Sequence, residues 1–217
     1  MKKILFALSA LSMVSLSAPA FSQAADYSSP WFLRAGIADV QNMHKYTVSV
    51  GGGPVPGAQL DYHHVYTPLA EIGYSFADDW AAVATVGFPP AISAYGRGSI
   101  APYGKQLSTT FGPTAFTIQY QPFHSDVIRP YIGAGVSYLI IFSVHDASLQ
   151  QAALTNDFAP AFEVGSDFAL DPHYGLFVEV KKAFLHSKSS GTFAGFPVLG
   201  VAAISPWVFS TGATFHF

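Results

Sequence analysis

The sequence predicts an all-β protein, an eight-stranded antiparallel transmembrane β-barrel with short periplasmic turns and long extracellular loops. Half of the 217 residues are apolar and only 11% are charged, whereas a typical soluble domain is about 25% charged. The mean hydropathy is +0.32, yet no apolar run after the N-terminus approaches the roughly 18–20 residues that a membrane helix needs. Apolar residues instead alternate with polar ones, which is typical of strands that meet lipid with every second side chain.

The composition excludes several classes of function. Cysteine is absent, so disulfides, thiolate metal sites and cysteine nucleophiles are excluded. Aromatic residues make up 15% of the chain, which together with the low charge excludes disorder. The sequence has no basic patch or stripe, so we expect no nucleic-acid partner.

The N-terminus is predicted to be an export signal. Lys2 and Lys3 precede an apolar run over 4–16, and small residues follow, as in a signal peptide. Cleavage after Ala24 fits best, and Ala20 is the alternative. Residues 1–24 are therefore expected to be removed, leaving 25–217 as one barrel domain with 8 basic and 13 acidic residues, a net charge of −5. The expected location is the outer membrane of a Gram-negative cell.

Eight segments show period-two apolarity and have about the length that a tilted strand needs to cross a bilayer. They are 31–40, 62–76, 80–88, 109–120, 128–142, 158–170, 174–182 and 204–217. The connections alternate between short and long, which is typical of periplasmic turns and extracellular loops. The short ones are 77–79, 121–127 and 171–173, and the long ones are 41–61, 89–108, 143–157 and 183–203. Residues 147–154 could form a helical turn or two.

The faces of the strands predict what lines the barrel. Six charged residues inside the strands fall on the face opposite the bulky apolar side chains, and a charge facing lipid costs about 2–4 kcal/mol at mid-depth. We therefore expect them to point into the lumen, together with four apolar residues of the same face. These candidate lumen and selectivity residues are Arg34, Leu69, Glu71, Val83, Phe111, Glu163, Asp167, Phe177, Glu179 and Lys181.

The state of the lumen is left open by the sequence. A barrel of eight strands is narrow, with room for side chains or one small ligand. Glycines such as Gly133 and Gly165 on the lining face either leave space or relieve the curvature of the strands. The nearly balanced charges either form an ion-pair plug or set solute selectivity.

Two of the long loops are apolar for segments that face outward. They contain Phe88 and Ile92 in the first case and Phe193 and Phe196 in the second. Exposed apolar patches often mark ligand sites, so these residues could form a vestibule where small apolar solutes enter. Alternatively, the loops pack on one another as an extension of the barrel.

Aromatic residues are predicted to form a girdle at the membrane interface on the turn side. The candidates are Trp31, Tyr74, Trp80, Tyr120, Tyr174 and Trp207.

Signals for catalysis or metal binding are weak. His44, His63 and His64 lie near one rim, but no histidine has a metal-site spacing. His186 and Ser187 could be imagined as part of a lipid hydrolase, although no G-x-S-x-G is present. We expect no enzyme activity, no cofactor and no metal.

Three stretches resemble those of the OmpW family of outer-membrane β-barrel proteins. W-F-L-R-A-G-I-A-D-V (31–40) resembles its opening strand, R-P-Y-I-G-A-G-V-S-Y (129–138) its most specific internal motif, and S-P-W-V-F-S-T-G-A-T-F-H-F (205–217) its closing strand. Gly165, Asp167 and the D-P-H turn also fit. Gly212, Phe215 and Phe217 belong to a terminal pattern that resembles the signal read by the barrel-assembly machinery.

The resemblance implies a narrow, largely apolar channel for uptake of small hydrophobic molecules, released sideways into the membrane. It also implies lipid and lipopolysaccharide as neighbours, and reception of phage or bacteriocin. Lys181 departs from the family, since some members place a large aromatic residue near this position. The alternative function is a plugged structural or adhesive barrel that acts as a surface receptor.

Overall fold

A computed structural model describes residues 29–41, 44–61, 65–123 and 127–217, so the expected signal peptide lies outside the described residues. Nearly all described elements are strands, joined by one 3-10 turn, η1 (Ala101–Tyr103). No helix of the described residues is long and apolar enough to span a membrane.

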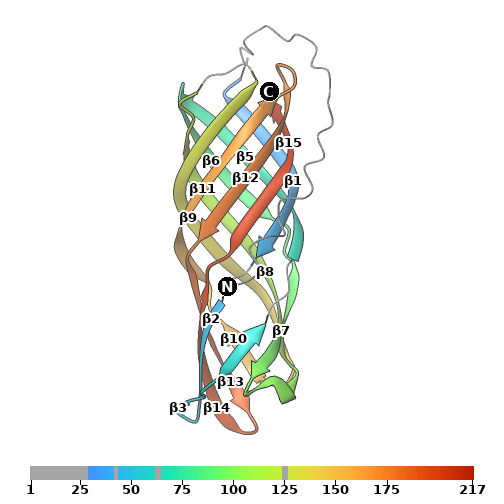
Figure 1. The fold of residues 1–217 in the computed structure, drawn as a ribbon, viewed down its shortest axis with the longest axis vertical. Helices are drawn as coiled ribbons and strands as arrows, with labels where there is room; N and C mark the ends of the chain where they lie inside the picture. The colour runs from blue at the N-terminus through green and yellow to red at the C-terminus, as the bar shows by residue number, and fades with distance from the viewer. Residues whose placement is uncertain (1–28, 42–43, 62–64, 124–126) are drawn as a thin grey trace, which may run out of the picture.

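Eight antiparallel strands close into a barrel, as the sequence predicts (Figure 1). Each pairs with the next around the circle, and pairing of β1 with β15 and of β8 with β9 completes it. In that order the strands are β1 (Trp31–Gln41), β5 (Val65–Ala77), β6 (Trp80–Gly87), β8 (Lys105–Tyr120), β9 (Ile128–Asp146), β11 (Asp157–Ala169), β12 (Tyr174–Ala183) and β15 (Trp207–His216).

The long connections are mostly β-structure rather than irregular loops. They form β2 (His44–Val50), β3 (Gly53–Pro54), β4 (Ala58–Asp61), β7 (Ala91–Gly98), β10 (Gln150–Leu154), β13 (Leu185–Phe193) and β14 (Phe196–Ile204). β7 pairs with the first half of β8 and β4 pairs with β7, and the other strands form a second sheet. The hairpins therefore extend the barrel beyond the membrane. The apolar loops pack on one another as an extension of the barrel, which is the alternative interpretation given above.

The predicted helical turn over 147–154 is wrong. Residues 150–154 form β10, which pairs with β13. The Asp146 carboxylate accepts the backbone N–H groups of Gln151 and Ala152 at 2.7 and 2.9 Å. These hydrogen bonds hold the turn between β9 and β10 and satisfy two backbone N–H groups without a helical turn.

Alternation of the side chains is confirmed across the barrel. Ile37, Ile132 and Val164 on the outer face are more than half exposed, whereas the six predicted lumen charges are buried. Three further charges inside the predicted strands were left out of that prediction, namely Asp39, Arg129 and Lys182. Asp39 and Lys182 lie on the outward face near the loop ends, where Gln41 Nε2 donates to Asp39 and Lys182 Nζ donates to the Ser205 carbonyl. The cost of a lipid-facing charge falls to about 0–1 kcal/mol near the interface.

The turn-side girdle is present with one correction. The rings of Trp31 and Tyr74 and those of Trp80 and Tyr120 lie in tilted contact, with centroids 4.8 and 4.7 Å apart. Trp207, however, pairs in register with Gln41 and Lys182 at the loop end. The eighth strand runs from the loop side to the turn side, so its first residue lies at the opposite interface.

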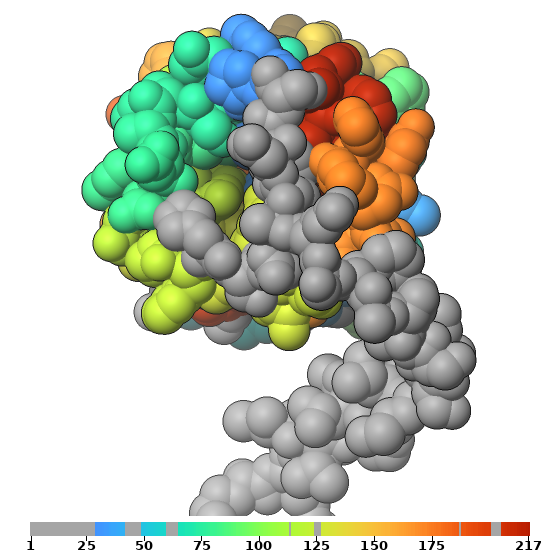
Figure 2. Space-filling view, turned by 90° about the horizontal axis from the view of Figure 1, so that it is seen from above, coloured from blue at the N-terminus to red at the C-terminus, as the bar shows by residue number. Residues whose placement is uncertain are grey.

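At the turn end, the ends of the barrel strands lie in a ring around the barrel axis. Figure 2, which looks onto this end, shows segments from β1 to β15 arranged in a ring. In the D-P-H turn before β12, Asp171 Oδ1 accepts the backbone N–H groups of His173 and Tyr174, both at 2.8 Å. These backbone hydrogen bonds lower the pKa of Asp171 below its usual value.

Charge on the outer face should be costly in proportion to depth. Val178→Lys, near the middle of β12, should lower the free energy of unfolding by about 2–4 kcal/mol, whereas Leu170→Lys at the turn should cost about 0–1 kcal/mol. Both side chains are about half exposed, so depth is the variable. Reversible urea unfolding in lipid vesicles measures both values, and equal losses would contradict this orientation in the membrane.

Candidate functional site: the barrel lumen

Arg34 is the centre of the lumen on the turn side. In the β-register it lies opposite Glu71 on β5 and Thr214 on β15. Its guanidinium binds Asp167 with two nitrogens, at 3.1 and 2.5 Å, and Glu71 Oε2 at 3.2 Å. The rings of Phe32 and Tyr131 lie 4.7 and 4.6 Å from the guanidinium carbon. A planar cation that always carries charge suits such a fully buried, forked arrangement.

Lys181 forms a second layer of the same cluster, on the loop side of Arg34. Its ammonium lies 2.5 Å from Glu71 Oε1, 2.6 Å from Glu179 Oε1 and 3.2 Å from Glu163 Oε2. Glu71 thus bridges the two cations. We call the six residues Arg34, Glu71, Glu163, Asp167, Glu179 and Lys181 the charged plug.

Polar neighbours complete the plug. Each carboxylate accepts at least one further hydrogen bond from a neutral side chain, which lowers the cost of burial. Gln119 Nε2 and Thr117 Oγ1 donate to Glu163 Oε1 at 2.7 and 2.9 Å. The other donors are Tyr131 and Ser210 to Glu179, Thr214 to Asp167 and Thr85 to Glu71.

These neutral partners were missed in the sequence. Tyr131 and Gln119 are almost fully buried, and both fall on the lining face of their strands. Face periodicity could therefore have found them, but only the register shows which carboxylate each one reaches.

Two lining glycines make room for the plug rather than for an open bore. A Cβ on Gly133 would lie 2.5 Å from a Glu163 carboxylate oxygen, and one on Gly165 would lie 2.5 Å from the Tyr131 ring. The space that glycine leaves is therefore already filled, and the plug closes the lumen at this level.

An apolar chamber of about 60 Å³ lies on the loop side of Lys181. Small and apolar side chains such as Ala38, Leu69, Ala161 and Val208 form its walls, and Lys181 forms its floor. Farther toward the loops, Leu139, Ala159, Ala183 and Leu185 form an apolar cluster, followed by Ala94, Leu107, Leu149 and Val198 in the extension. The interior on the loop side of the plug is therefore mostly apolar, with the hydroxyl groups of Thr67, Thr114 and Ser137 on the chamber wall.

The four apolar lumen candidates lie at different depths along the barrel axis. Leu69 and Phe177 pack with Ala38 beside the chamber, and Val83 packs with Phe32 near the turn end. Phe111 is only partly buried and lies against the cluster around Leu139.

The four candidate loop residues do not form one patch. Phe88 and Phe196 are 69% and 61% exposed, Ile92 is buried, and Phe193 packs edge-on against Tyr103 with ring centroids 4.7 Å apart. The structure therefore divides them between outer surface and the core of the extension.

The barrel wall is interrupted beside the chamber. β6 pairs with β8 up to Val86–Thr114, and β7 resumes pairing at Ala91–Thr110. Between them, residues 87–90 face 111–113, and the Phe111 N–H reaches the Pro90 carbonyl at 3.4 Å. We call this interruption the proline seam, because Pro89, Pro90 and Pro113 have no backbone N–H to donate.

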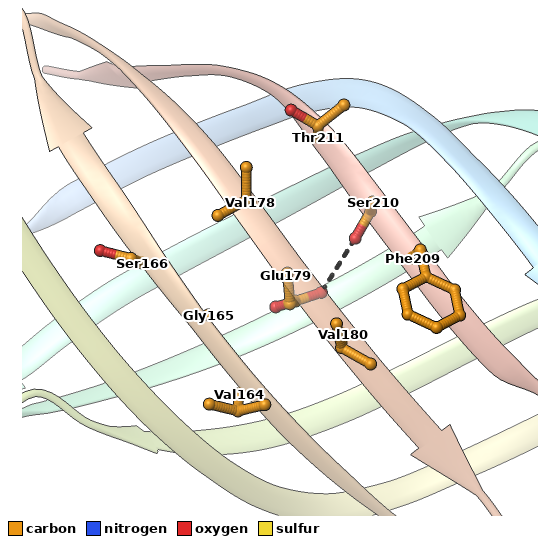
Figure 3. A pocket seen from close by; sticks show the side chains of 9 residues that line it. All are labelled: Val164, Gly165, Ser166, Val178, Glu179, Val180, Phe209, Ser210 and Thr211. Carbon is orange, nitrogen blue, oxygen red and sulfur yellow. Dashed lines mark hydrogen bonds between the residues drawn. The ribbon is translucent and has the colours of Figure 1, made fainter. Parts of the chain in front are cut away.

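A shallow depression of about 380 Å³ lies on the outer face of the wall. Figure 3 shows its lining, with Ser210 donating to Glu179 between β15 and β12. Val164, Val178 and Phe209 in this lining are about half exposed, so the depression belongs to the outward surface and is distinct from the chamber.

The C-terminal residues close the barrel. Gly212 pairs with Gly36, and a Cβ on Gly212 would lie 2.1 Å from the Ala35 carbonyl oxygen. Phe215 contacts Tyr174 and Phe217, with ring centroids about 5 Å apart. Their expected role in assembly stays a prediction.

The histidines give no site in the described part of the chain. His63 and His64 lie outside the described residues, as does the side chain of His44. His186 is exposed on β13, and its backbone N–H donates to Asp157 at 2.6 Å. Among the described residues, no group of three or more metal-ligating side chains occurs.

Comparisons with known proteins agree with this architecture. The sequence profile of the OmpW family matches residues 29–217. The dibenzothiophene metabolism operon protein PahQ of Pseudomonas aeruginosa is 32% identical over 75% of this chain and 77% of its own length. The outer membrane protein AlkL of Ectopseudomonas oleovorans is 28% identical over 78% and 74%.

The fold is also that of a solved structure. The crystal structure of the outer membrane protein OprG from Pseudomonas aeruginosa superimposes with a TM-score of 0.82, covering 88% of this chain and 97% of OprG at 20% identity. The barrel is thus an outer-membrane barrel, and the chain belongs to the OmpW family.

Proposed function

We propose that the protein is a narrow passive channel through which small hydrophobic molecules cross the outer leaflet and leave sideways into the membrane. The observation that carries the proposal is the order of surfaces along the axis. Two apolar clusters lie inward from the extracellular tip, a mostly apolar chamber follows, and a buried charged plug ends the series. An apolar solute that reaches the chamber would have to separate the buried ion pairs of the plug to continue, so the axial route is unfavourable.

The proline seam is the proposed exit. It lies beside the chamber, since Gly87 of the seam and the adjacent Thr114 both line the chamber. Over this stretch the wall has fewer hydrogen bonds to break than a regular ladder. A sideways exit also releases the solute into hydrocarbon, where apolar surface is favoured.

The named relatives support the substrate class. PahQ is named for an operon of dibenzothiophene metabolism, and dibenzothiophene is an apolar aromatic compound. The proposal requires no catalytic residue, cofactor or metal. Lipopolysaccharide would surround the extension, and the C-terminal strand would be presented to the barrel-assembly machinery.

A second function is favoured by the plug itself. A lumen closed by ion pairs suits a structural or adhesive barrel whose exposed hairpins receive phage or bacteriocin. The two functions differ in one respect, because only the channel raises the uptake of an apolar solute.

Uptake by whole cells tests the channel. Cells with an intact lipopolysaccharide leaflet should take up naphthalene faster with the protein than without it. The intact leaflet is required because naphthalene crosses plain phospholipid unaided. Ala38→Phe, which fills the chamber, should lower the protein-dependent rate by at least about tenfold, equivalent to 1.4 kcal/mol. The matched control is Ala35→Phe on the exposed face of β1. Equal uptake with and without the protein would favour the receptor function.

Cross-linking tests the exit. The chain has no cysteine, so Ala91→Cys with Thr110→Cys places one pair at the seam, in register between β7 and β8. Oxidation should slow naphthalene uptake and reduction should restore it, because the disulfide holds β7 against β8. Ala84→Cys with Phe116→Cys makes the same bond in the regular ladder of β6 and β8 and should have no effect. Unchanged uptake through an oxidised seam would place the exit elsewhere.

A further inference from the structure

The chamber next to the plug has few hydrogen-bond donors to offer a ligand. The hydroxyl groups of Thr67, Thr114 and Ser137 on its wall already donate to backbone carbonyls, at 2.6, 3.0 and 3.0 Å. Thr85 Oγ1 donates to Glu71 at 2.9 Å. These oxygens keep lone pairs, so the chamber can accept a hydrogen bond from a ligand.

Lys181 at the floor of the chamber already has three carboxylates around it, and its ammonium donates hydrogen bonds to two of them, Glu71 and Glu179. The distances from its ammonium nitrogen to the three carboxylates are 2.5 to 3.2 Å. Lys182 donates outside the lumen to the Ser205 carbonyl at 2.6 Å and lies over the Trp207 ring. A ligand carboxylate would therefore have to compete with three carboxylates for Lys181, while the Lys182 ammonium is held at Ser205 and Trp207.

The net charge of the plug also disfavours binding of an anion in the chamber. Its four carboxylates exceed its two cations, so it is negative by two charges when all are ionised, and it stays negative if one carboxyl group is protonated. Arg129, opposite Asp167 in the register, lies at the turn end, on the far side of Arg34 from the chamber. An anion in the chamber would face the excess carboxylates through a medium that screens charge poorly.

We propose that the chamber is an anion-excluding site that accepts uncharged apolar molecules, including those with a hydroxyl group, and rejects the carboxylates of the same skeleton. Glu163 and Glu179 are the specificity-determining residues, because they provide the negative charge beyond what Arg34 and Lys181 balance. This inference rests on the proposed channel function.

A matched pair of fluorescent solutes tests the inference. 2-Naphthalenemethanol and 2-naphthoate share one ring system, and the second is an anion at about pH 7. Protein-dependent uptake is the rate in cells with the protein minus the rate in cells without it. We expect the alcohol to be taken up at least about tenfold faster than the carboxylate.

Charge removal then tests the two glutamates. Glu163→Gln with Glu179→Gln makes the plug neutral with little change in volume, and should raise the ratio of carboxylate to alcohol uptake by at least about tenfold. Asp78→Asn with Asp79→Asn removes the same charge at the turn between β5 and β6 and should leave the ratio unchanged. Heat-dependent gel mobility verifies that each barrel is folded, and Glu163→Gln alone replaces the double variant if that one does not fold.

The outcomes separate the two proposals. No protein-dependent uptake of either solute would overturn the channel, and with it the inference. Equal uptake of alcohol and carboxylate would overturn the inference and leave the channel standing. A carboxylate that stays excluded after the glutamates are neutralised would overturn their role.

Discussion

Two cations held among four carboxylates inside a membrane barrel constrain the rest of this structure. Arg34 and Lys181 are buried, and an isolated buried charge is so costly that its partners must be in place. Glu71 contacts both cations, so β1, β5 and β12 must meet in one register. A slip of one residue would turn the charges toward lipid, and the plug therefore ties the register of distant strands together.

The small residues of the lumen follow from the same constraint. A barrel of eight strands has space for side chains and little else. The side chains of Glu163 and Tyr131 fit in the lumen only because Gly133 and Gly165 opposite them have no side chain. On the loop side of Lys181 the lining is mostly alanine, leucine and valine, and the hydroxyl groups of Thr67, Thr114 and Ser137 there donate to backbone carbonyls. The protein thus has a polar half that is filled and an apolar half in which a chamber remains.

The sequence predicts the barrel well because side-chain direction in a strand has a strict period of two. That period assigns Arg34, Glu71 and the other plug residues to the lumen without any knowledge of the fold. It cannot say whether the charges form a plug or a selective lining, because that depends on register across strands that are far apart in the sequence. The strands of the extracellular hairpins were not predicted from the sequence for a related reason. Residues 150–154 pair with β13, some forty residues away, and a local pattern carries no trace of such a partner. Trp207 was misplaced by overlooking strand direction, which the sequence does contain.

The closed plug has a consequence for the cell envelope. A water-filled pore conducts ions and admits polar toxins in proportion to the number of copies, so its abundance is limited by leakage. A barrel whose axis is sealed by its own ion pairs adds no such conductance. For the channel proposed above, the number of copies is therefore not limited by leakage of salts and hydrophilic antibiotics.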